Sequence, residues 1–375
     1  MVDDLTPFLI EAADFDTDYN FEGSHNRYWL DETISCVVTR YGTIGWDLEL
    51  EYPASGRCWD LMASRNIIVV TVANSGIAGV EGQKEPFRIK RVRRNLDGHI
   101  VVTAEHIVYD IKGIPLSPYT ATTASAAMSG ISSHSMTTNP FSFSSQKTAN
   151  GSFALLTPTP IWDTLGGMEG SIIDAFGGGE YDISGTTVIL KNRIGADNGL
   201  KVQYGVNMTS FEQDESCASC YTGAVAYWGR EVDNTFQEVH TDVVNASGTY
   251  NYTNIATFDF TSYFDEKPSK SELTTFLQAY MTINDIGSPS ISLEVSFVDL
   301  SKTIEYADIS WMYKVDFGDT IHVEFPKYDV NVSARVCETK WDVLRDRYES
   351  ISLGNYKPTV ADTIANQSKE IDSLK

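Results

Sequence analysis

The stretch that decides the fold reads WDLELEYPASGRCWD and spans residues 46–60. Its first half alternates apolar with acidic residues, which is the two-residue period of a β-strand with one buried and one solvated face. Pro53 ends the pattern because it has no backbone N–H to donate, and Ser55-Gly56 supplies a turn. Residues 46–52 therefore predict a half-buried strand whose outer face is wholly acidic.

Most of the remaining chain carries the same strand period. Runs of alternating or β-branched residues, bounded by Gly, Pro, Asn or Ser, are typical of short strands. We expect further strands at 67–72, 87–92, 100–109, 181–183, 187–191, 200–204, 291–297, 304–315, 320–325 and 330–337. The class is mainly β with α insertions, an α+β fold.

Three segments carry a helical pattern instead. Residues 117–138 are rich in Ser, Thr and Ala and allow either a flexible linker or a helix. Residues 161–176 form a helical segment that glycines interrupt. The clearest helix spans 269–284, where Ser269 and Glu272 form a capping box and apolar residues follow at a spacing of three and four.

Composition and charge bound the function. The chain has 375 residues, enough for two or more domains, and its formal net charge is −23, with 51 acidic against 28 basic residues. A field of this sign repels nucleic-acid phosphates and anionic membranes. No window has the length and apolarity of a membrane span, and no signal peptide is visible. We expect synthesis in a cytoplasm and no membrane anchor.

Catalytic motifs are absent from the sequence. It contains no H-E-x-x-H, G-x-S-x-G or Walker motif. His106 is a weak catalytic candidate, and a packed histidine is the more frequent role of such a residue on a strand. Cys217 and Cys220 are weak metal candidates, because a zinc site needs two more ligands and the other three cysteines are remote. We expect no cofactor and no metal.

Several blocks, in a fixed order, carry a family resemblance. The main blocks are PFRI at 86–89, VVTAEHIVYD at 101–110, NPF at 139–141, LGGMEGSI at 165–172, FGGGEY at 176–181 and FGDT at 317–320. Together with residues 46–52, they resemble the N-terminal hub region of the minor structural proteins and tail-associated lysins (the prophage tail endopeptidase family) of phages that infect Gram-positive bacteria. The likeness covers roughly residues 40–357.

The resemblance implies the phage tail-hub fold, with two similar β-barrels, a helical insertion and a C-terminal helix. The pattern alone does not establish that the two barrels are duplicates. The implied domains are a first β-barrel at 1–115, completed by about 180–212; a helical insertion at 116–179; a second β-barrel at 213–340 that contains the helix 269–284; and C-terminal helices at 341–375 that lead to a stalk.

The implied function is structural. The protein would be a homotrimeric hub at the tail tip of the virion, closing the tail tube and seating the central fibre or lysin. Its partners would be the distal tail protein, the tape-measure protein and other baseplate proteins, with the host cell wall as a further contact. DNA would only pass through the lumen, and the acidic face of residues 46–52 would line it and repel phosphates.

Two other functions stay open. In longer members of the family the lytic activity lies in domains after the hub region, so this chain resembles a hub without the cutting part. A cell-wall peptidase that uses His106 or the Cys217–Cys220 loop is one alternative. A wall-carbohydrate-binding module is the other, because seven Trp and nineteen Tyr include rings that could stack on sugars.

The C-terminus carries two helical patterns. Trp341, Leu344, Tyr348 and Ile351 predict a short amphipathic helix. After Pro358 an apolar seam recurs at alternating spacings of four and three, as in a coiled coil. It is either a terminal helix on the barrel surface or the start of a three-stranded stalk, and we expect the stalk in the full assembly. Its residues are Val360, Ile364, Gln367, Ile371 and Leu374.

Overall fold

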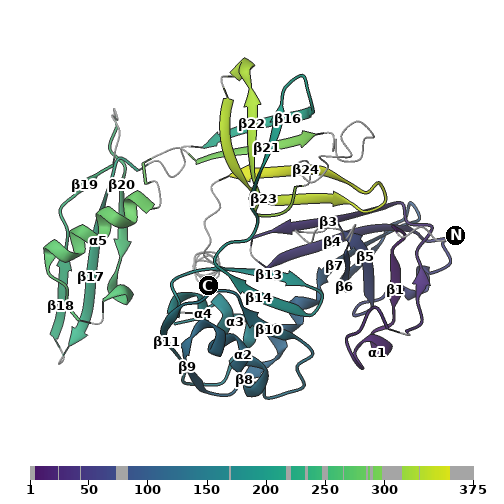
Figure 1. Cartoon of the computed structure of the whole chain (residues 1–375), viewed down its shortest axis with the longest axis horizontal. Coiled ribbons are helices and arrows are strands. Elements are labelled where there is room, and N and C mark those ends of the chain that lie inside the picture. Colours follow the sequence, from purple (N-terminus) through teal and green to yellow (C-terminus); the bar gives the residue numbers. More distant parts are fainter. Residues whose placement is uncertain are drawn as a thin grey trace. The chain divides into compact units, whose positions relative to one another are not determined.

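The computed structural model describes most of the chain, and Figure 1 labels its elements. The described residues are 5–23, 25–42, 44–72, 83–168, 170–216, 221–232, 235–246, 252–264, 266–283, 286–287, 290–297, 315–328 and 330–354. Strands dominate and helices are short, which confirms the mainly β class. The chain forms two compact units: unit 1 comprises Met1–Glu212 and Glu294–Lys375, and unit 2 comprises Gln213–Leu293.

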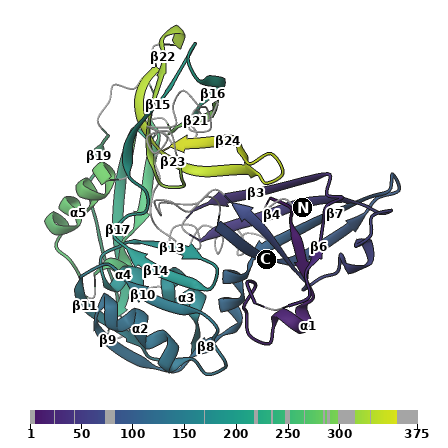
Figure 2. The ribbon, with the colours of Figure 1, turned by 45° about the vertical axis from the view of Figure 1, so that its right-hand side comes forward.

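The first strands of unit 1 form one antiparallel sheet around β4 (Gly45–Pro53), which pairs with β3 (Ser35–Tyr41) and β7 (His99–His106) (Figure 2). The apolar residues of the 46–52 stretch are buried, and Glu49 is exposed, so the predicted strand is confirmed. The sheet continues through β6 (Gln83–Arg94), β5 (Ile67–Val72), β1 (Phe8–Ile10) and β2 (Tyr28–Trp29), with α1 (Ala12–Phe15) and η1 (Trp59–Leu61) in its connections.

Residues 107–191 of unit 1 combine short helices with small sheets. Thr123 caps α2 (Ala124–His134) by accepting a hydrogen bond from the N–H of Ala126, so the segment contains a helix. Its buried residues are Ala124, Ala127, Met128 and Ile131. The predicted 161–176 helix is split into α3 (Ile161–Gly166) and α4 (Ile172–Ala175). The other elements are η2 (Ile107–Gly113), β8 (Pro115–Leu116), β9 (Tyr119–Thr123), β10 (Ser142–Ser145), β11 (Asn150–Leu155), β12 (Thr159–Pro160), β13 (Glu180–Ser184) and β14 (Thr187–Lys191).

The last strands of unit 1 return to its first sheet. β23 (Val330–Asp342) pairs with β3, so residues 330–342, which the sequence assigned mainly to a second barrel at 213–340, extend the first sheet. β22 (Thr320–Phe325) pairs with β23 and with β15 (Asp197–Gln203). The same sheet also includes β24 (Arg347–Gly354), β21 (Ser290–Phe297) and β16 (Met208–Ser216). The short helix η6 (Pro326–Tyr328) follows β22.

The predicted helix over residues 341–351 is wrong. β23 runs to Asp342, a turn follows, and β24 begins at Arg347. Trp341 and Tyr348 face each other across this hairpin, with ring centroids 4.7 Å apart. Ile351 and Leu353 are both buried, which is a two-residue period. The three- and four-residue spacing in this segment arises because a turn separates the end of β23 from the start of β24, not because the segment is helical.

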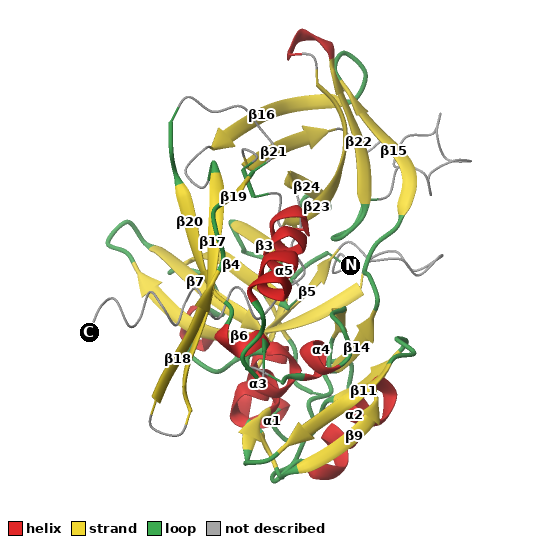
Figure 3. Ribbon diagram, turned by 90° about the vertical axis from the view of Figure 1, so that its left-hand side faces the viewer, coloured by secondary structure: helices red, strands yellow, loops and turns green. Residues whose placement is uncertain are grey.

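Unit 2 consists of a small sheet with α5 (Lys270–Ile283) along one face, as Figures 1 and 3 show. The capping box is present: the N–H of Ser269 donates to Glu272 at 2.8 Å, and the N–H of Glu272 donates to the Ser269 hydroxyl at 3.2 Å. Small residues of the sheet, including Ala224 and Ala226, pack against α5. The sheet contains β17 (Gly223–Val232), β18 (Thr235–His240), β19 (Val244–Asn245) and β20 (Ile255–Asp259), followed by η3 (Thr261–Tyr263).

Some predictions fall outside the described residues. These include most of the predicted 304–315 strand, Cys217 and Cys220, and the seam of Val360, Ile364, Gln367, Ile371 and Leu374.

Candidate functional site: four buried polar junctions

His106 lies at the end of β7 with both ring nitrogens engaged. Its side chain is buried; Nδ1 accepts a hydrogen bond from the N–H of Val108 at 3.1 Å, and Nε2 lies 3.0 Å from Oε2 of Glu85. Because Nδ1 is an acceptor, the ring proton is on Nε2, and the ring donates it to Glu85. This arrangement leaves His106 no free nitrogen with which to act as a base or a metal ligand.

The His106 junction, formed by His106, Glu85 and Gly185, joins two parts of unit 1. Oε2 of Glu85 also accepts a hydrogen bond at 2.7 Å from the N–H of Gly185, in the turn between β13 and β14. The rings of Trp46 and Phe87 lie 5.4 Å from the imidazole. A buried pair in this setting fixes the β13–β14 hairpin to the first sheet.

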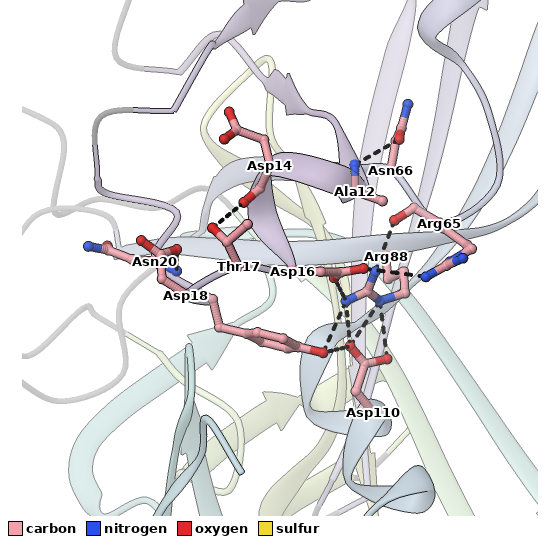
Figure 4. Close-up of polar contacts among 11 residues, drawn as sticks. Ala12, Asp14, Asp16, Thr17, Asp18, Asn20, Arg65, Asn66, Arg88 and Asp110 are labelled. Atoms are coloured by element: carbon pink, nitrogen blue, oxygen red, sulfur yellow. Dashed lines mark hydrogen bonds and ion pairs between the residues drawn. The ribbon is translucent and has the colours of Figure 1, made fainter. Parts of the chain in front are cut away.

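The Arg88 junction is shown in Figure 4. The Arg88 side chain is 9% exposed and lies between two carboxylates: Nη2 donates to Asp16 at 2.8 Å, and Nε donates to Asp110 at 2.9 Å. Nη1 donates to the carbonyl of Arg65 at 3.1 Å. Burial, followed by the charge of Asp110, raises the pKa of the adjoining Tyr19 to about 12. Asp110 of η2 is thus a partner of Arg88.

The Arg335 junction connects β13, β23 and two loops. Arg335 forms a bidentate pair with Glu180, with both N···O distances at 2.6 Å, and Nε donates to the carbonyl of Gly318 at 2.8 Å. Gly195 and Gly318 have φ values of +74° and +88°. A Cβ on Gly195 would lie 2.2 Å from the carbonyl carbon of Gly318, so only glycine fits there. The Glu180 carboxylate further accepts from the N–H of Ile194 at 2.6 Å.

The Arg40 junction is bound less tightly. Arg40 of β3 is 5% exposed, yet its nitrogens lie 3.6 Å from Asp182 and 3.5 Å from Asp316. Its guanidinium carbon lies 4.7 Å from the ring centroid of Trp46 and 5.0 Å from that of Phe317. Nε and Nη2 have no hydrogen-bond partner. Burial raises the pKa of Asp316 to about 7, although the charge of Arg40 acts in the opposite direction.

Each of the four junctions includes residues of the sequence blocks that carried the resemblance. Blocks more than one hundred residues apart meet in unit 1, and each junction holds backbone segments through charged hydrogen bonds or aromatic contacts. Across the described residues, no group of three or more His, Cys, Asp or Glu could hold a metal ion. Nor does the described part of the chain contain a helix that is long and apolar enough to cross a membrane. The contacts of the four junctions attach backbone segments that are distant in the sequence to one another.

Sequence reasoning missed Arg40, Glu85 and Arg335. The partners of Glu85 and Arg335 come from distant segments, so no local pattern reveals them. For Arg40 a signal existed: Cys36, Val38 and Arg40 occupy the inward positions of one strand, so a charge interrupts an apolar alternation. An inward charge in a strand predicts a buried partner without identifying it.

Comparison with known proteins gives a consistent result. The model of the prophage endopeptidase tail family matches residues 196–364. The structure resembles that of prophage tail protein gp18 from Listeria monocytogenes EGD-e, with a TM-score of 0.54 at 12% identity over 98% of this chain and 99% of that one. It also resembles the 43 kDa tail protein of prophage MuSo2 from Shewanella oneidensis, with a TM-score of 0.55 at 10% identity over 94% and 98% of the two chains.

A tail protein from Neisseria meningitidis MC58 gives a TM-score of 0.53 at 9% identity over 93% and 96% of the two chains. No curated protein matches this chain. At these identities the solved structures establish the fold, which extends along nearly the whole chain.

Proposed function

We propose that this chain, whose residues 196–364 match the prophage endopeptidase tail family and whose fold resembles that of phage tail proteins, forms the hub of a tail tip. In the proposal three copies form a ring that closes the tail tube and seats the central fibre or lysin. Each chain contributes two similar β-barrels, so the ring has six, which matches a sixfold tube to a threefold fibre. The observation that carries the proposal is the tail-protein fold along 93–98% of the chain.

The polar junctions support a structural role. In the Arg88 and Arg335 junctions each arginine donates from all three of its nitrogens to carboxylate or carbonyl oxygens. Such saturated networks hold the segments that they join rigidly. The engaged state of His106 does not favour the peptidase alternative.

We propose that the acidic face of β4 lines the lumen of the ring. Asp47, Glu49 and Glu51 lie on the face of β4 opposite the buried Trp46 and Leu48. Asp47 pairs in register with Glu105 of β7; burial, with the charge of Glu105 adding to it, raises the pKa of Asp47. A wall of this sign repels DNA phosphates and lets DNA slide.

The remaining parts of the proposal concern partners and the C-terminus. The distal tail protein and the tape-measure protein are the proposed neighbours in the virion tail, with the host wall beyond. Residues 360–374 are proposed to leave the hub as a three-stranded stalk. Cysteine at Ile371 should then form crosslinks between subunits under mild oxidation.

Oligomeric state tests the proposal directly. Native mass spectrometry of the purified protein at high concentration should give a mass of three copies. Cryo-electron microscopy of assembled tails should show three copies around a central opening. A single copy in an assembled tail tip would overturn the proposal that the chain forms a trimeric hub. Release of wall fragments by the purified chain, abolished by His106→Ala, would support the peptidase instead.

A further inference from the structure

The sheet of unit 2 has one face that no helix among the described residues of the unit covers. α5 packs against the side that carries Ala224, Ala226 and Trp228, and the alternate residues of β17 point to the opposite side. We call this opposite side the open face. Register places the following residues on it: Tyr227, Gly229, Phe236, Glu238, His240 and Asp259.

Two aromatic rings of the open face are exposed. Phe236 is 69% exposed, and its ring covers Gly229, where an added Cβ would lie 2.8 Å from a ring carbon. Tyr227 is 38% exposed, and its hydroxyl donates to Asp259 at 2.9 Å, which fixes the ring. Gly229 is two residues from Tyr227, so the two rings lie about 7 Å apart along β17.

The polar groups beside the rings are hydrogen-bond acceptors of negative charge. The side chain of Glu238 is 54% exposed and lies 3.3 Å from His240, which is 60% exposed. Glu231 is opposite Phe236 in the register, on the same face. Among the described residues of this face there is no Lys or Arg. Arg230 belongs to the other side, over the ring of Trp228.

From this combination we propose that the open face of unit 2 binds an uncharged polysaccharide. The C–H faces of sugar rings pack on exposed aromatic rings, and sugar hydroxyls donate to carboxylates, which have several acceptor positions. The acidic field repels phosphate-bearing polymers, nucleic acids and anionic lipids, so the ligand is a neutral glycan. The inference stands on unit 2 alone and does not depend on the trimeric hub.

A basic polypeptide is the rival occupant, since it would also be attracted by the acidic groups. The open face favours a sugar because the exposed ring of Phe236 lies over Gly229 and offers an aromatic surface on which a sugar ring can pack. Ionic attraction to a basic peptide falls with salt, whereas ring packing against a sugar does not. Salt dependence therefore separates the two.

Affinity electrophoresis of the full chain tests the proposal. The gels contain, in turn, a neutral β-glucan, a neutral galactan, peptidoglycan glycan strands freed of phosphate polymers, or a teichoic acid. At least one neutral glycan should retard the protein equally at low salt and at about 0.3 M salt, where the Debye length falls to roughly 6 Å. Phe236→Ala and Tyr227→Ala should each weaken the association by roughly 2- to 13-fold, the equivalent of one aromatic contact.

Tyr328→Ala is the matched control, because Tyr328 is 62% exposed but belongs to η6 of unit 1; its retardation should equal that of the wild type. Thermal unfolding of all three variants checks that the fold is intact. The proposal is overturned if none of the neutral glycans retards the protein. It is also overturned if the Phe236→Ala, Tyr227→Ala double variant is retarded as strongly as the wild type. Binding only to teichoic acid, or to polylysine at low salt, also overturns it. The number of subunits, measured on the same samples, tests the hub separately.

Discussion

Two arginines of unit 1 are buried to a similar degree but are held in different ways. Arg88 has three nitrogens engaged with Asp16, Asp110 and a backbone carbonyl at 2.8–3.1 Å. Arg40 lies between two aromatic rings, with carboxylates at 3.5–3.6 Å and two nitrogens without a hydrogen bond. The same side chain thus serves as a hydrogen-bonded anchor in one place and as a charge packed against rings in the other.

The difference predicts different energetics. Charge-assisted hydrogen bonds are directional, and removing one member leaves the others buried without a partner. Contacts between a cation and aromatic rings are less directional, and a long apolar side chain reproduces part of them. Substitution of the two arginines should therefore separate the two modes, although both side chains are almost fully buried.

The largest effect is expected for Arg88→Met. Methionine keeps much of the volume but leaves Asp110 without a cation and Asp16 with only the exposed Arg65, whose Nη2 lies 3.5 Å away. We expect a loss of about 3 kcal/mol in the free energy of unfolding, measured by denaturant titration, because Asp110 is left unpaired while Asp16 keeps Arg65 and some solvent contact. The double variant Arg88→Met, Asp110→Asn should recover part of that loss. Equal losses in the single and double variants would show that the ion pairs are not the source.

The second prediction concerns the Arg40 junction and pH. The folded state raises the pKa of Asp316 from 3.8 to about 7. The folded chain therefore retains a proton that the unfolded chain has lost, so this contribution to stability is complete below about pH 4 and disappears as the pH rises through 7. Asp316→Asn removes that slope. The unfolding free energy of the variant relative to the wild type should rise from pH 5 to pH 8, by an amount on the order of a few kcal/mol.

Asp242→Asn is a control with the opposite sign. Lys270 lowers the pKa of Asp242, so any change of slope there must run in the other direction and at lower pH. A relative stability of Asp316→Asn that stays flat between pH 5 and pH 8 would contradict a raised pKa in the folded chain. It would also remove the electrostatic distinction between the two arginine junctions.

Arg40→Met should cost less than Arg88→Met. Methionine can occupy the space between Trp46 and Phe317, and its sulfur makes favourable contacts with aromatic rings. At pH 6 we expect a loss of about 1–2 kcal/mol, because Asp316 is then largely protonated and little charge is orphaned. An equal loss of unfolding free energy for Arg40→Met and Arg88→Met in the same denaturant titration would contradict the distinction between the two junctions. It would mean that the aromatic packing around Arg40 contributes as much stability as the hydrogen bonds of Arg88.

The sequence predicted the parts that depend on local patterns. β4 follows from the alternation of Trp46 and Leu48 with acids, and α5 follows from its capping box and apolar stripe. The hairpin at 341–351 was not predicted, because a turn happened to set Trp341 and Tyr348 at a helical spacing. The junctions were beyond a sequence argument for a different reason: the partner of Arg335 is Glu180, and nothing local selects it.

The smallest effect is expected in unit 2, where Ser269→Ala removes the helix cap of α5. The Ser269 hydroxyl accepts from the N–H of Glu272 at 3.2 Å, and this bond is exposed. Water can replace it, so we expect a loss of about 1 kcal/mol, measured by hydrogen exchange at the first turn of α5. Ser271→Ala is the control, because Ser271 lies two residues further on within α5 and is also exposed. The control should change the protection of α5 little. Protection should fall at α5 while the amides of β3 and β6 keep theirs. If the cap variant also lowers the protection of amides around Arg88, the two units unfold together. The unfolding free energies lost in the Arg88 and Arg40 variants would then describe the whole chain and not each junction.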